Sequence, residues 1–129
     1  MLHHNFFPFM SSNSKYETRA LMNIGKAINI LSQCNCDIVL HGHTHRPEIA
    51  LHQSSSFYDS GYKGNKKLLF ISSGTSGGEA PSRDIAKSFN IIDISFDVEN
   101  QRRRVLITPY AYNSMNVNWS EREGVTFYL

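Results

Sequence analysis

Hydrophobic residues recur at helical spacing in one part of this chain and in short, strand-like runs elsewhere. From Lys15 to about Ser32, apolar side chains return every three or four residues, which places them on one face of a helix. Ser14 and Glu17 form the S-x-x-E pattern of an N-terminal capping box. The pattern therefore predicts one amphipathic helix that begins near Ser14, ends near Ser32 and covers a sheet.

The other apolar runs have the length and spacing of β-strands. The predicted strands span 37–40, 48–52, 68–71, 89–98, 104–112 and, at the tail, an edge strand at 125–129. A turn at 99–101 joins the fourth and fifth of these into a hairpin, and the basic run Arg102–Arg104 beside it is interpreted as a charged, protective sheet edge. Loops are expected at 53–67 and 72–78, which are rich in Ser, Gly and other polar residues. The predicted fold class is α/β, a mixed sheet with one main helix.

Composition narrows the functional classes. The 129 residues suffice for one modest domain, and 40% apolar with 12% aromatic residues indicate a globular chain. A formal net charge of +2 argues against a general nucleic-acid or membrane binder. No segment is long and apolar enough to span a bilayer and no signal peptide is recognisable, so we expect a cytoplasmic protein. Cys34 and Cys36 form a single C-x-C pair, whereas a zinc site of the finger type needs two such clusters. We therefore interpret them as reduced thiols.

Candidate chemistry follows the predicted strand at 37–40, where the chain reads HGHTH from His41 to His45. Open α/β sheets usually hold their ligands at the carboxyl ends of their strands. In an extended chain, residues two apart point the same way, so His43 and His45 can face one pocket. Two imidazoles together suit a divalent ion such as zinc. An isolated H-x-H pair is more often two surface histidines, so the surrounding pattern has to decide.

That pattern, an apolar strand followed by Gly-His-Thr-His and then Arg-Pro, resembles the last metal-binding motif of the calcineurin-like metallophosphoesterases. The start of the chain is similar to the histidine loop of that family, because His3 and His4 precede an apolar loop that contains Pro8. Without the resemblance, the two histidines would be interpreted as a frayed terminus or a tag remnant. The resemblance leaves open whether His3 or His4 is the ligand.

What the resemblance implies is a dinuclear hydrolase with a four-layer α/β/β/α sandwich fold. His3 and His43 would bind one ion and His45 the other, and the two ions (Mn, Fe or Zn) would lie about 3.5–4 Å apart. A hydroxide between them would attack the phosphorus of a phosphomonoester or phosphodiester, with nucleotides among the candidate substrates. Substrate-facing roles are expected for His4 and, in the Gly- and Ser-rich loop, for Ser73 and Gly74.

The family's earlier motifs, Asp-x-His, Gly-Asp and Gly-Asn-His-Asp/Glu, are absent from these 129 residues. We therefore expect residues 1–129 to be a partial, N-terminally truncated domain that matches only the C-terminal half of the family fold. Alone, such a chain would bind at most one divalent ion, weakly, and would not turn over phosphoesters. Its incomplete sheet would favour association with the missing half or with another copy. The alternatives are a catalytically dead remnant that binds a partner, and a small single-metal module.

Overall fold

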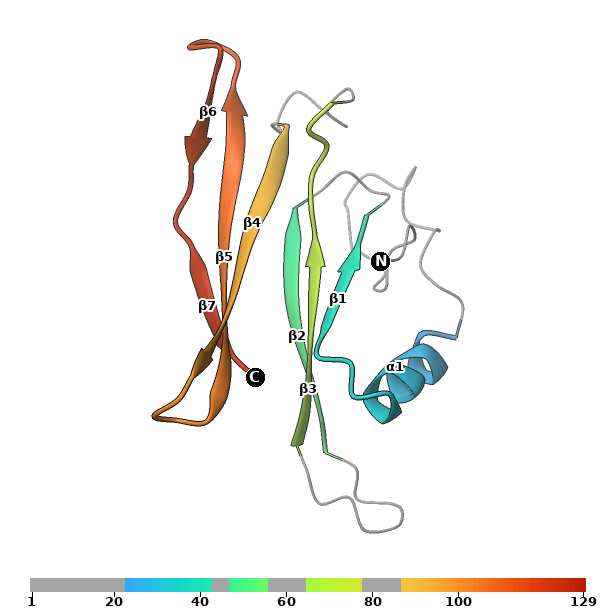
Figure 1. Ribbon diagram of the computed structural model, residues 1–129. Helices are drawn as coiled ribbons and strands as arrows, with labels where there is room; N and C mark the ends of the chain where they lie inside the picture. The colour runs from blue at the N-terminus through green and yellow to red at the C-terminus, as the bar shows by residue number, and fades with distance from the viewer. Residues whose placement is uncertain (1–22, 43–46, 56–64, 78–86) are drawn as a thin grey trace. The chain divides into compact units, whose positions relative to one another are not determined.

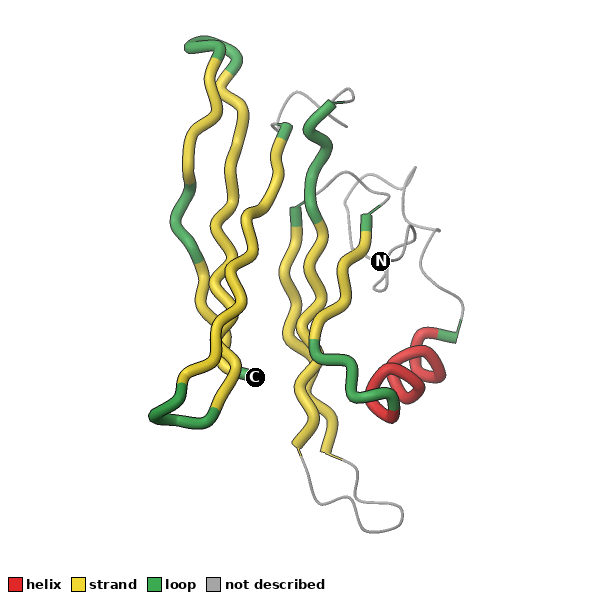
Figure 2. The backbone as a smooth tube through the Cα atoms, viewed as in Figure 1, coloured by secondary structure: helices red, strands yellow, loops and turns green. Residues whose placement is uncertain are grey.

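The structure, a computed structural model, describes residues 23–42, 47–55, 65–77 and 87–129 (Figure 1). Within these ranges the chain is mixed α/β, with one helix and mostly strands (Figure 2). The chain divides into two compact units: a first unit of Met1–Thr44 with Glu48–Ser72, and a second unit of His45–Pro47 with Ser73–Leu129. None of the described helical segments is long and apolar enough to cross a membrane.

The first unit contains a three-stranded sheet in the order β1-β3-β2. Its strands are β1 (Ile38–His41), β2 (Glu48–Ser55) and β3 (Asn65–Ser72). The central strand β3 runs parallel to β1 and antiparallel to β2, so the carboxyl ends of β1 and β3 lie at the same end of the sheet. Both β2 and β3 extend into the segment 53–67 that was predicted to be a loop, because their register continues beyond the apolar residues to Ser55 opposite Asn65.

Helix α1 (Ile24–Gln33) packs on one face of this sheet. The core between helix and sheet consists of Ile28, Val39, Leu68 and Phe70, with Ile24, Ala27, Leu31, Cys36 and Ala50 packed around them. The predicted cover of a sheet by an amphipathic helix is therefore confirmed. Alternate residues of the three strands face α1, because side chains along a strand alternate between the two faces of its sheet.

The ends of α1 correct the predicted helix boundaries. Asn23 has a left-handed backbone, with φ of 67°, so the predicted helix does not run continuously through Asn23; the predicted capping box lies outside the described residues. At the other end Asn35 is also left-handed, with φ of 53°. The N–H of Asn35 donates to the Ser32 carbonyl (3.3 Å) and the N–H of Cys36 to the Leu31 carbonyl (3.0 Å), which is a Schellman cap.

Both thiols near this cap are free, and the Cys36 thiol donates a hydrogen bond to the Ile38 carbonyl (3.3 Å).

The second unit contains a four-stranded antiparallel sheet built around one long strand. Its strands are β4 (Ser88–Asp97), β5 (Arg102–Asn113), β6 (Asn118–Glu121) and β7 (Val125–Tyr128). The predicted hairpin of β4 and β5 is confirmed, while β6 was not predicted. On its other side β5 pairs with β6 near its carboxyl end and with β7 near its amino end.

The expectation that Arg102–Arg104 form a protective sheet edge is wrong. Arg104 lies in β5 between Ser95 of β4 and Tyr128 of β7, and the backbone of Arg103 exchanges hydrogen bonds with Leu129. The basic run therefore belongs to the central strand, and β4 is an edge of this sheet.

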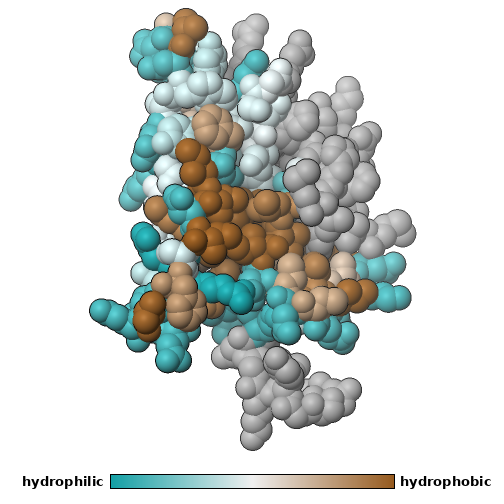
Figure 3. All heavy atoms as spheres, viewed as in Figure 1, coloured by the Kyte–Doolittle hydropathy of each residue, from teal (hydrophilic) through white to brown (hydrophobic). Residues whose placement is uncertain are grey.

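Val105 and Ile107, two of the residues that follow in β5, are fully buried. Hydrophobic residues also reach the surface of the molecule, as the brown spheres in Figure 3 show.

Candidate functional site

Three polar residues, here called the strand-end row, lie side by side at the carboxyl end of the parallel strands in the first unit. His41 of β1 is in register with Ser72 of β3, which is in register with Glu48 of β2. Residues directly opposite each other share a face of the sheet, so the imidazole, the hydroxyl and the carboxylate lie on one face. This strand-end row follows Val39 and Phe70 by two residues and therefore shares the face that α1 covers.

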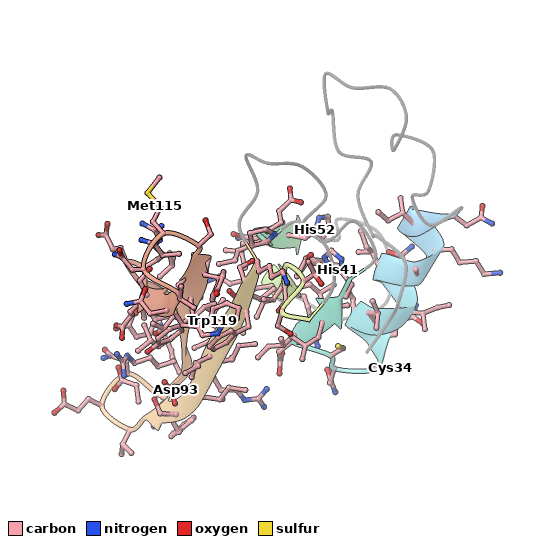
Figure 4. The ribbon with its side chains drawn as sticks, turned by 90° about the horizontal axis from the view of Figure 1, so that it is seen from above. Cys34, His41, His52, Asp93, Met115 and Trp119 are labelled. Carbon is pink, nitrogen blue, oxygen red and sulfur yellow. The ribbon has the colours of Figure 1, made fainter. Side chains whose placement is uncertain are left out.

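His41 lies inside the fold at this strand end (labelled in Figure 4), with only 7% of its surface exposed. Burial lowers the pKa of its imidazole from the ordinary value of 6.5, and a hydrogen bond with the backbone of Gly42 acts in the opposite direction. The imidazole is consequently neutral at pH 7. The prediction placed the end of this strand one residue earlier, at Leu40. The alternation of Val39 with His41 is the signal that would have identified the imidazole as inward-facing.

We expect the first unit to lose stability as the pH falls below 6.5, because of His41. The unfolded chain takes up a proton near its ordinary pKa of 6.5, while the folded chain resists that proton, so the unfolded state binds more protons in this range. The contribution of His41 is therefore complete above 6.5 and is lost as the pH falls through the lower folded pKa. Urea unfolding of wild type and His41→Gln at pH 7.5, 6.5 and 5.5 measures it; an identical pH dependence in both proteins would contradict the assignment.

The structure places only part of the predicted site. His3, His4, His43 and His45 all lie outside the described residues, so their convergence on one metal stays a prediction. The described residues extend to Gly42, directly after β1, and resume at Pro47. In the ranges that the structure describes, no group of three or more His, Cys, Asp or Glu side chains is arranged to hold a metal ion.

Ser73 and Gly74, the predicted substrate-facing residues, follow β3 directly. Ser73 is exposed, whereas Gly74 lies against Ser88, the first residue of β4. A Cβ atom on Gly74 would overlap the Ser88 Oγ and come within 3.2 Å of the Ser88 Cβ. The Ser88 N–H donates to the Thr75 carbonyl (3.0 Å), which fixes the two segments together. Packing alone therefore accounts for a glycine at position 74, and its role toward a substrate stays a prediction.

Four aromatic rings gather on the other sheet, in the second unit. Phe89 and Tyr110 stack with ring centroids 5.0 Å apart, and Trp119 meets Phe89 edge-on at 4.8 Å and Tyr112 at 5.4 Å. The Tyr110 hydroxyl donates to Glu121 Oε2 (2.7 Å), which raises the pKa of Tyr110. Because the rings pack against one another, they consolidate β4, β5 and β6, and we assign them no ligand. The sequence pattern did not predict this cluster.

Comparison with known proteins found no similar family or protein. No protein-family model matches the chain, and neither a curated protein nor a solved structure matches it. The Gly-His-Thr-His motif and the strand end from which it starts are therefore the features that point to a function.

Proposed function

We propose that this chain carries the Gly-His-x-His part of a dinuclear metal centre and is related to the calcineurin-like metallophosphoesterases. The proposed reaction is metal-dependent hydrolysis of a phosphomonoester or phosphodiester, with a nucleotide as one candidate substrate. The finer fold that accompanies this proposal is a four-layer α/β/β/α sandwich, of which these residues supply a part.

The observation that supports the proposal best is the starting point of the motif. Strand β1 ends at His41, directly before Gly42, and runs parallel to β3 with α1 packed on the same sheet. In open α/β sheets this end of parallel strands is the usual ligand site. The two histidines that follow, His43 and His45, are two residues apart, which suits a shared pocket if the chain there is extended.

The donor chemistry fits divalent ions in part. Imidazoles at His3, His43 and His45 are ligands that Mn, Fe and Zn accept. When two such ions are bound, they supply an activated water and stabilise the charge that develops on the phosphoryl oxygens. The carboxylates that such a pair of ions requires are not present here in an Asp-x-His or Gly-Asp motif. A complete centre therefore needs ligands from outside these 129 residues.

Metal titration by calorimetry tests the proposed ligands. We expect the 129-residue chain to bind at most one Mn²⁺ or Zn²⁺, and His43→Ala or His45→Ala to weaken that binding about tenfold or more, which corresponds to about 1.4 kcal/mol. His52→Ala is the matched control, because His52 lies within β2 rather than in the motif and should leave the affinity unchanged. Equal affinity in all four proteins would remove the motif from consideration as a metal site.

Hydrolysis of a chromogenic phosphodiester with Mn²⁺ separates the enzyme from its alternatives. The 129-residue chain alone should show no turnover, and addition of a segment with the Asp-x-His and Gly-Asn-His-Asp/Glu motifs, covalently or as a second chain, should restore it. Metal binding without restored turnover would favour the single-metal module, and neither binding nor turnover would favour the remnant that binds a partner.

A further inference from the structure

In the part of the chain that the structure describes, most of the edge strand β4 lacks the usual protection against pairing with another chain. It pairs with β5 on one side. On its other side the N–H of its first residue, Ser88, donates to the Thr75 carbonyl, and no described strand pairs with the residues that follow. Strand β4 is ten residues long, whereas the edge strand β1 of the other sheet has four. Natural edge strands are commonly interrupted by proline or lysine, and β4, with the sequence SFNIIDISFD, contains neither.

The apolar side chains of β4 gather on one face. Ile92, Ile94 and Phe96 alternate along the strand and therefore share the face of Val105 and Ile107 of β5, with which Ile94 and Ile92 are in register. The side chain of Ile94 is 61% exposed and that of Phe96 is 60% exposed, although both belong to the face that buries Val105 completely. An additional strand beside β4 would extend this face and bring neighbouring side chains into contact with both of them.

We propose that β4 pairs antiparallel with β4 of a second copy of this chain, in a register centred on Ile94. In a closed two-fold dimer, residue i faces residue j of the other copy and j faces i. A centre at Ile94 places Ile94 opposite itself and Ile92 opposite Phe96 of the second copy, so the three apolar residues of this face meet one another.

Neighbouring symmetric registers are worse. A centre at Asp93 places that carboxylate opposite its own copy, and a centre at Ser95 places Asp93 opposite Asp97 twice; like charges directly opposite each other destabilise a strand pair. A centre at Ile92 leaves Ile94 opposite Asn90. Among the registers centred on Ile92 to Ser95, the one centred on Ile94 is therefore the most self-complementary.

Charge complementarity supports the same register and a second copy as the occupant. With the centre at Ile94, Asp93 of the second copy lies opposite Ser95, whose other neighbour is Arg104 of β5. Strands in a sheet are about 4.8 Å apart, so the backbones of Arg104 and that aspartate would be about 10 Å apart, with only a small serine between them. An extended arginine side chain spans most of that distance, and the two-fold symmetry creates the ion pair twice.

Sedimentation equilibrium of the 129-residue chain tests the dimer. The mass should rise with concentration from 14.7 kDa toward twice that value. Ile94→Lys should weaken dimerisation at least tenfold, because two ammonium groups would face each other at the axis. Met115→Lys is the matched control: its side chain is 92% exposed in the β5–β6 turn (Figure 4), away from the β4 edge, and dimerisation should be unchanged. A monomeric wild type, or an Ile94→Lys variant that dimerises as wild type does, would overturn the proposal.

Two further variants test the register. Asp93→Arg and Arg104→Asp should each weaken the dimer, and the double variant should restore it, because the opposite charges meet again in exchanged positions. In a background with Cys34→Ser and Cys36→Ser, Ile94→Cys should form an intermolecular disulfide, since directly opposite strand residues lie within the Cα separation of about 4.4–6.8 Å that a disulfide needs. Failure of both results would refute this register. Mass and cross-linking do not depend on the proposed metal centre, so the two proposals fail separately.

Discussion

Replacing Phe70 with alanine is expected to destabilise the first unit by about 3–5 kcal/mol, the usual cost of removing a buried phenylalanine side chain. Phe70 has no exposed surface and lies in β3, the central strand, between Val39 of β1 and Ala50 of β2. It also belongs to the cluster that joins the sheet to α1. Since the free energy of unfolding of a small domain is about 5–15 kcal/mol, this loss would remove a large part of the stability. Urea unfolding followed by far-UV circular dichroism measures it.

The matched control for Phe70→Ala is Leu51→Ala in the adjacent strand β2. Leu51 lies on the opposite face of the sheet and 44% of its surface is exposed, so its truncation should cost about 1 kcal/mol or less. Hydrogen exchange of the backbone amides in β1 and β3 should rise in the Phe70 variant and stay near the wild-type rate in the Leu51 variant. Equal losses in the two variants would contradict a core centred on Phe70.

The second large effect is expected for Gly74→Ala, at about 1–3 kcal/mol, which is the typical cost of forcing an extra methyl group into a packed site. The new methyl group would overlap the Oγ atom of Ser88, and the Ser88 side chain is itself buried at the start of β4. The Ser88 side chain would have to rotate or the segment after β3 would have to move. The free energy of unfolding, measured in urea, reports the loss.

Ser88→Ala provides the compensating variant. Within the described structure the Ser88 Oγ is buried without a hydrogen-bond partner, so its removal alone should be neutral or slightly stabilising. In the double variant most of the Gly74→Ala loss should be recovered, because the overlapping oxygen is gone while a Cβ contact at 3.2 Å remains. A double variant that is as unstable as Gly74→Ala would show that the cost has another origin.

The strands that the sequence predicts well are those with a continuous or strictly alternating apolar pattern. The run 68–71 lies within β3, where all four side chains are buried. The alternating run 89–98 nearly coincides with β4, although Ile94 and Phe96 are largely exposed, so there the period of two alone identifies the strand. The strand residues Asn65–Lys67 were missed because they are held by pairing with β2, which polar residues satisfy equally well. Strand β6 was missed for the same reason: its residues Asn118–Glu121 pair with the end of β5.

For the candidate site, the sequence predicts ligand types but not their assembly. The Gly-His-Thr-His motif can be found by spacing alone, while the inward orientation of His41 and its alignment with Ser72 and Glu48 follow from the register of β1, β3 and β2. Register between strands distant in sequence has no local signature, so the strand-end row could not be predicted. The clash that fixes Gly74 is equally non-local, because it depends on Ser88.

Trp119 is the only tryptophan of the chain, and it packs edge-on against Phe89 and Tyr112 in the second unit. Its indole fluorescence will therefore report the environment of β4, β5 and β6. An emission-based melting curve would follow the second unit, because Phe89 and Tyr112, the rings that Trp119 meets, belong to that unit. A fluorophore engineered into the first unit would be needed to report the His41 strand directly by fluorescence.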